Sequence, residues 1–226
     1  MQPGRSFGLG GVAMRSESPF VITISRQLGS GGAHIGRKLA TDLGISYADR
    51  DILERAAESL QVRAEDIEAQ EESAPSFLQS VLESYTFAVP EVSCIPALEV
   101  PSFGELREAE AEVIRELATR QSVVIVGRAG FHLLAKHPRH LSIFLFAALE
   151  FRANRVEELY GISHEQALRV IEESDRARRR YIQQVTGRPW TDILLRFDVT
   201  LCTSTLGLML AERVLCETAR IHFRPT

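Results

Sequence analysis

The sequence predicts an α/β fold, in which a parallel β-sheet is covered by helices on both faces. Short apolar runs typical of buried strands alternate with longer stretches that carry apolar residues at helical spacing. A cluster of glycines stands directly between the first strand and the first helix. With 226 residues, 45% of them hydrophobic and 25% charged, the chain is long enough to bury the core of such a domain.

The first half of the pattern begins with a strand over 21–25, which is rich in β-branched residues. After the glycines, a helix is predicted over 33–43, because its apolar residues share one face and Gly44 is a typical helix stop. A second short strand covers 45–48. A helical pattern follows at 52–60.

Residues 63–103 interrupt this alternation. Acidic residues dominate their first part, and three prolines are spread over 77–103. We therefore predict an insertion at 63–103, and its apolar part at 77–103 is a candidate surface for contact with a second copy of the chain. Residues 1–18 are glycine-rich and are predicted to be a disordered tail, which leaves 19–226 as the folded domain.

The alternation then resumes and completes the sheet. The strand signal at 122–126 is strong, because it is almost entirely Val and Ile and is broken by the Gly127-Arg128 pair. The remaining predicted elements are helices at 105–119, 149–160, 164–184 and 206–220 and strands at 141–146 and 198–202.

Charge and composition argue against several classes of protein. The net charge of −4 disfavours a broad nucleic-acid-binding surface. No apolar run approaches the roughly 18–20 residues that span a membrane. The three cysteines are scattered, so neither a zinc site nor a disulfide framework is indicated, and a cytoplasmic location is expected. Every basic residue except Lys38 and Lys136 is arginine, and neither lysine completes a G-x-x-x-x-G-K-[ST] loop.

The glycine loop is the strongest functional signal. Backbone N–H groups at the start of a helix form an anion site with the helix dipole, and glycines let a phosphate approach the backbone closely. The alternative is a glycine-rich turn with a purely structural role. The residues expected to bind the phosphate, which the resemblance described next makes the donor phosphate, are Gly29, Ser30, Gly31, Gly32, Ala33 and His34.

The whole pattern resembles the cytidylate kinase-like family of P-loop kinases. The resemblance covers about residues 19–216, and the segments that carry it are Ile22–Gly32, Ile35–Ala40, Leu43–Ile52, Val124–Arg128, Glu150–Arg155 and Asp175–Tyr181. It implies a three-layer P-loop NTPase-type fold with a five-stranded parallel sheet, a helical lid at about 160–190 and a substrate-side insertion at 63–103. It also implies phosphoryl transfer from ATP, with Mg²⁺, to a nucleoside monophosphate such as CMP or dCMP.

The loop departs from this family at an important position. Gly32 stands where the family has its loop lysine, Arg26 replaces the first loop glycine, and Val126 replaces an acid. That lysine normally offsets phosphate charge during transfer. We therefore expect an arginine to replace it, and Arg26 is the leading candidate. Arg26 can alternatively brace the loop on a carboxylate, and the protein can be a catalytically degenerate, nucleotide-binding regulatory or interaction protein.

Further site residues follow from the resemblance. Asp49 and Arg50 are expected to bind the acceptor, although Asp49 can also simply cap the helix at 52–60. Arg128 is expected to contact the acceptor phosphate, or else to form a salt bridge at the sheet edge. Arg178 is the best match to an arginine that closes over the transferring phosphate, so the expected catalytic residues are Arg26, Arg128 and Arg178. The expected lid residues are Arg155, Asp175, Arg178 and Arg179, and the alternative for each is a solvated helix face.

Overall fold

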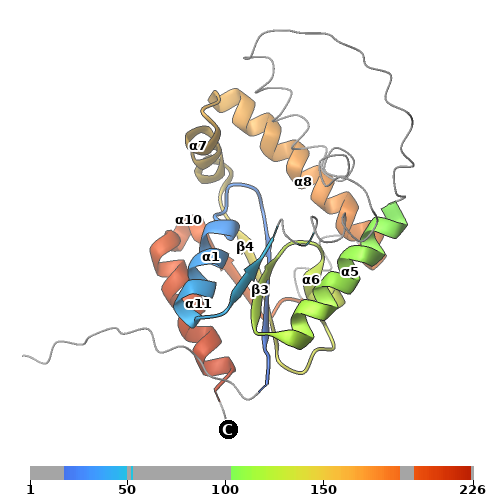
Figure 1. Cartoon of the computed structure of the whole chain (residues 1–226). Helices are drawn as coiled ribbons and strands as arrows, with labels where there is room; N and C mark the ends of the chain where they lie inside the picture. The colour runs from blue at the N-terminus through green and yellow to red at the C-terminus, as the bar shows by residue number, and fades with distance from the viewer. Residues whose placement is uncertain (1–17, 50–51, 53–102, 189–195, 225–226) are drawn as a thin grey trace, which may run out of the picture.

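A computed structural model of the chain describes residues 18–49, 52, 103–188 and 196–224 (Figure 1). These residues form a five-stranded, entirely parallel sheet with the order β2-β3-β1-β4-β5. The strands are β1 (Val21–Arg26), β2 (Ser46–Ala48), β3 (Val123–Val126), β4 (His140–Phe146) and β5 (Val199–Cys202). Because all strands point the same way, their carboxyl ends lie at one edge of the sheet, where ligands of open α/β sheets bind.

Helices cover both faces of this sheet. In Figure 1, α1 and α11 lie on one face and α5 and α6 on the other, while α7 and α8 lie beyond the carboxyl edge. The helices are α1 (Gly32–Leu43), α5 (Phe103–Arg120), α6 (Gly130–Leu133), α7 (Leu149–Tyr160), α8 (His164–Thr186), α10 (Thr203–Leu206) and α11 (Leu208–His222).

The two faces of β1 show why the molecule has three layers. Ile22 and Ile24 are fully buried in a core with α1 and α11. Val21 is buried in a second core with Ile114 of α5. Consecutive side chains of a strand point to opposite faces, so a strand whose first five residues are all buried needs helices on both sides.

The predicted three-layer fold with five parallel strands is confirmed. All five predicted strands form, with ends that shift by one residue at most. The helix predicted at 206–220 forms as α11 and begins two residues later, because Gly207 separates it from the short helix α10, which was not predicted. Phe103, assigned to the insertion, begins α5. Residues 1–17 of the predicted tail at 1–18, Arg50, residues 53–60 of the predicted helix at 52–60 and the insertion up to 102 lie outside the described residues. Among the described residues, no helix is long and apolar enough to cross a membrane.

Candidate functional site

Three strands end close together at the carboxyl edge. Arg26 is the last residue of β1, Asp49 follows β2 and Gly127 follows β3. The Arg26 Nη2 atom lies 3.7 Å from Asp49 Oδ1, and both side chains are mostly buried. Gly127 has φ +83°, and a Cβ there would collide with Arg26 Nη1. The guanidinium of Arg26 therefore occupies a slot between Asp49 and the backbone of Gly127.

The stem of Arg26 passes over the first residue of helix α1. A Cβ at Gly32 would lie 2.6 Å from Arg26 Cγ and 2.7 Å from Arg26 Cβ. Atoms cannot approach so closely without moving the neighbour. The space in which a side chain at position 32 would begin is thus filled by Arg26.

The start of α1 presents backbone donors. Its N-cap, Gly31, has φ +87°, no side chain caps the helix, and its first turn holds no acidic residue. The first backbone bond runs from Ile35 N to Gly31 O at 2.9 Å. The N–H groups of Gly32, Ala33 and His34 consequently have no acceptor within the helix, as expected at a helix N-terminus. These donors fit a phosphate group.

The side chain of His34 points elsewhere. Its Nε2 lies 2.9 Å from Glu212 Oε1 on helix α11. His34 was predicted to bind a donor phosphate. Because its side chain contacts α11, its backbone N–H is the group that remains available for this role.

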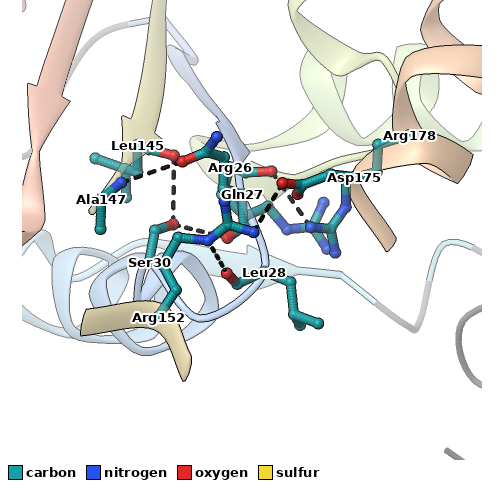
Figure 2. A network of polar contacts seen from close by, with 9 residues as sticks. All are labelled: Arg26, Gln27, Leu28, Ser30, Leu145, Ala147, Arg152, Asp175 and Arg178. Atoms are coloured by element: carbon teal, nitrogen blue, oxygen red, sulfur yellow. Dashed lines mark hydrogen bonds and ion pairs between the residues drawn. The ribbon is translucent and has the colours of Figure 1, made fainter. Parts of the chain in front are cut away.

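Hydroxyl and amide side chains bond the glycine loop to the neighbouring strand and helix (Figure 2). Ser30 is fully buried, and its hydroxyl lies 2.8 Å from Gln27 O and 3.3 Å from Leu145 O. The backbone N–H of Ala147 donates to the Gln27 side chain at 3.2 Å, and the Thr203 hydroxyl donates to Ser30 O at 2.9 Å. The Ser30 hydroxyl is thus bonded inside the protein, and the loop shape is fixed by contacts to β4 and α10.

Two arginines reach the loop from α7 and α8 (Figure 2). Arg152 donates from Nε to Leu28 O at 2.7 Å and from Nη2 to Asp175 Oδ2 at 2.8 Å. Arg178 donates from Nη1 to Arg26 O at 3.5 Å. The structure thus brings Arg178 to the end of β1 directly and joins Asp175 to the loop through Arg152. It also brings Arg152 to the loop, which like Arg155 lies in the segment Glu150–Arg155 and matches a basic position before the lid of the family.

The other two lid residues lie differently. Arg179 is exposed on α8, and Arg155 is half-buried on α7. In the described part of the chain, neither forms a hydrogen bond or ion pair with the glycine loop. The Arg155 Nε atom is buried and has no hydrogen-bond partner among these residues.

Arg128 forms a salt bridge, which was the alternative to its expected contact with the acceptor phosphate. Its Nη1 lies 3.0 Å from Oε1 of Glu110, a fully buried residue of α5, and Tyr181 on α8 donates its hydroxyl to Glu110 Oε2 at 3.4 Å. Arg128 and Ala129 both have φ +49°, a left-handed conformation that costs energy in residues other than glycine. Such strain concentrates at functional sites.

Asp49 is held by its own strand as well as by Arg26. The Tyr47 hydroxyl donates to Asp49 Oδ2 at 2.9 Å, and Ile52 N donates to the Asp49 carbonyl at 3.4 Å. Burial, followed by the nearby Asp49 charge, raises the pKa of Tyr47, so its hydroxyl stays a donor. The carboxylate therefore sits between one neutral donor and one cation.

Metal binding at this edge depends on few carboxylates. Among the described residues, no group of three histidine, cysteine or acidic side chains gathers into a metal site. Mg²⁺ in kinases is usually held by phosphate oxygens, waters and one or two carboxylates. Among the described residues, Asp49 has its carboxylate at the carboxyl edge beside Arg26, and one such carboxylate fits a magnesium ion that is otherwise held by phosphate oxygens and waters.

Comparison with known proteins yields one family. The sequence model of the cytidylate kinase-like family matches residues 21–205, most of the chain. No curated protein sequence matches significantly.

Solved structures with a similar fold include an uncharacterized protein from Eubacterium ventriosum. It has a TM-score of 0.65 and 19% identity, over 88% of this chain and 98% of that chain. A shikimate kinase from Acinetobacter baumannii scores 0.43 at 17% identity, covering 89% and 91%. A gluconokinase from Sinorhizobium meliloti scores 0.47 at 16% identity, covering 92% and 100%.

Proposed function

This chain belongs to the cytidylate kinase-like family, and on that premise we propose that it transfers a phosphoryl group from ATP to a small acceptor, a nucleoside monophosphate such as CMP or dCMP. The start of α1 and the glycine loop before it would hold the donor phosphates through backbone N–H groups. Phosphoryl transfer needs little covalent participation from the protein, so catalysis depends on positioning and on charge.

The observation that carries the proposal is the position of Arg26. The usual lysine of a P-loop extends from the residue that is Gly32 here. In this chain the Arg26 side chain runs over Gly32 and fills that space from the opposite end of the loop. A guanidinium can therefore neutralise phosphate charge at this end of the loop, with Asp49 and Gly127 fixing its orientation.

The remaining residues have separate proposed roles. Arg128 and Asp49 would orient the acceptor, and Arg178 would supply positive charge where it develops on the transferring phosphate. Mg²⁺, bound with the nucleotide, would neutralise and orient the donor phosphates. Both Arg26 and Arg128 already have carboxylate partners, so an incoming phosphate would compete with Asp49 and Glu110 for them.

Phosphate transfer from ATP to a panel of nucleoside monophosphates tests the proposal. We expect transfer by the wild type and a loss of about 10²–10³-fold in kcat for Arg26→Ala, because a charge that stabilises the transition state is worth at least that much in related reactions. The matched control is Arg115→Ala, which removes an exposed arginine paired with Glu108 on α5. Full transfer by Arg26→Ala would refute the role of Arg26.

A second candidate function has its own support. Val126 and Gly32 replace two residues on which catalysis in the family depends, which favours a nucleotide-binding regulatory protein without catalysis. In that case the wild type would bind ATP, measured by calorimetry, and transfer phosphate to no monophosphate in the panel. Turnover by the wild type would exclude this alternative.

A further inference from the structure

Arg152 joins the phosphate loop to helix α8 through a single buried guanidinium. Its side chain is 4% exposed. One edge bonds Leu28 O and another bonds the Asp175 carboxylate (Figure 2). The planar, multi-donor guanidinium is suited to two partners at fixed angles, whereas the single ammonium of lysine is not.

The backbone and apolar contacts at this point agree with the polar ones. Gly29 has φ +79°, and a Cβ there would lie 2.7 Å from the carbonyl oxygen of Arg152, so the loop lies directly against helix α7. Leu28 packs on the apolar cluster between α7 and α8, which includes Val156 and Ile171. A shift of the loop is therefore expected to displace α7 and α8 as well, because closely packed interiors transmit displacements.

Asp175 and Arg178 are almost one helical turn apart on α8, so they lie on the same side of that helix. Arg178 Nη1 lies 3.5 Å from the carbonyl of Arg26, the last residue of β1, after which the loop begins. The bond from Arg152 to Asp175 thus fixes the part of α8 from which Arg178 reaches the Arg26 carbonyl. We propose that Arg152 and Asp175 are positioning residues that couple the phosphate loop to α8, so that a nucleotide in the loop sets the position of Arg178. The identity of that nucleotide, ATP, rests on the proposed function.

The test is Asp175→Asn, which keeps the shape of the side chain and removes its charge. Glu172→Gln is the matched control, because Glu172 lies one turn earlier on α8 in an exposed pair with Arg176. Hydrogen exchange of 26–32 and 164–186 is measured with and without Mg-ATP, together with kcat and KM. In the wild type, ATP should slow exchange in both segments. In Asp175→Asn, it should still protect 26–32 but no longer 164–186, and kcat should fall about 10–10²-fold with KM for ATP changed less than about threefold.

A second variant, Arg152→Lys, retains the charge but cannot make both bonds, and it should uncouple the segments in the same way. Protection of 164–186 that persists in both variants as in Glu172→Gln would overturn the proposal. So would faster exchange spread evenly over the sheet without ATP, which indicates a purely structural role. If the wild type transfers no phosphate, yet ATP protects both segments and Asp175→Asn uncouples them, the proposed function fails and the coupling stands.

Discussion

At residues 26 and 32, only one of the two positions has room for a side chain. A Cβ at 32 would lie 2.7 Å from the Cβ of residue 26, so the conflict begins at the first side-chain atom and does not depend on the arginine's length. A loop of this shape accommodates glycine at 26 with a side chain at 32, or a side chain at 26 with glycine at 32. This chain has the second arrangement, with arginine as the side chain.

The exclusion predicts a non-additive pair of substitutions. Gly32 lies in a helix with an ordinary backbone conformation, so Gly32→Ala should cost about 1–3 kcal/mol of unfolding free energy purely through the collision with Arg26. In the Arg26→Gly background the same substitution should cost less than about 0.5 kcal/mol. Urea denaturation of the four proteins measures the coupling, and equal costs in both backgrounds would contradict it. Arg26→Ala is not a suitable background, because it keeps the offending Cβ.

At the scale of single elements, the glycine loop is stabilised by its buried hydroxyl. Ser30→Ala leaves the Leu145 and Gln27 carbonyls with one donor fewer in a site without solvent access, and we expect a loss of about 1–2 kcal/mol. Thr218→Val is the control, because its hydroxyl bonds the Val214 carbonyl on an exposed helix face and should matter by less than about 0.5 kcal/mol. Equal effects in denaturation experiments would show that the bonds of Ser30 contribute nothing.

The helices and strands were predictable where apolar residues follow each other or recur at a regular spacing along the sequence. Strands β3 and β4 are nearly continuous apolar runs, and apolar residues at helical spacing indicate α7 and α8. The break at Gly207 was missed because apolar residues stand on both sides of it. Its φ of +72°, which glycine adopts without strain, separates α10 from α11.

The site was predictable only in part, for a related reason. Parallel strands bring their carboxyl ends to one edge, so the sequence placed Arg26, Asp49 and Arg128 there correctly. Their partners were not predictable, because those contacts join distant segments. Arg152 and Leu28 are 124 positions apart, and neither residue type indicates the other.

At the scale of the whole molecule, a histidine at the amino-terminal edge of the sheet makes the stability of the fold depend on pH. His140, at the start of β4, has Nε2 2.7 Å from the hydroxyl of the buried Thr23 on β1. Burial lowers the pKa of His140 to about 4, from about 6.5 in an unfolded chain, while the nearby Asp198 charge opposes this shift. The folded protein therefore holds fewer protons on this ring than the unfolded chain does between these two values.

Stability from this residue should be fully present above about pH 6.5 and lost as the pH falls toward 4. By pH 5 the wild type should lose up to about 2 kcal/mol of unfolding free energy through His140. His140→Gln can still bond the hydroxyl of Thr23 but does not titrate, and it shares every other titrating group with the wild type. Urea denaturation of both proteins at pH 7 and 5 therefore isolates the ring. The wild type should weaken more than the variant, and parallel losses would mean that His140 accepts its proton in the folded state as readily as in the unfolded one.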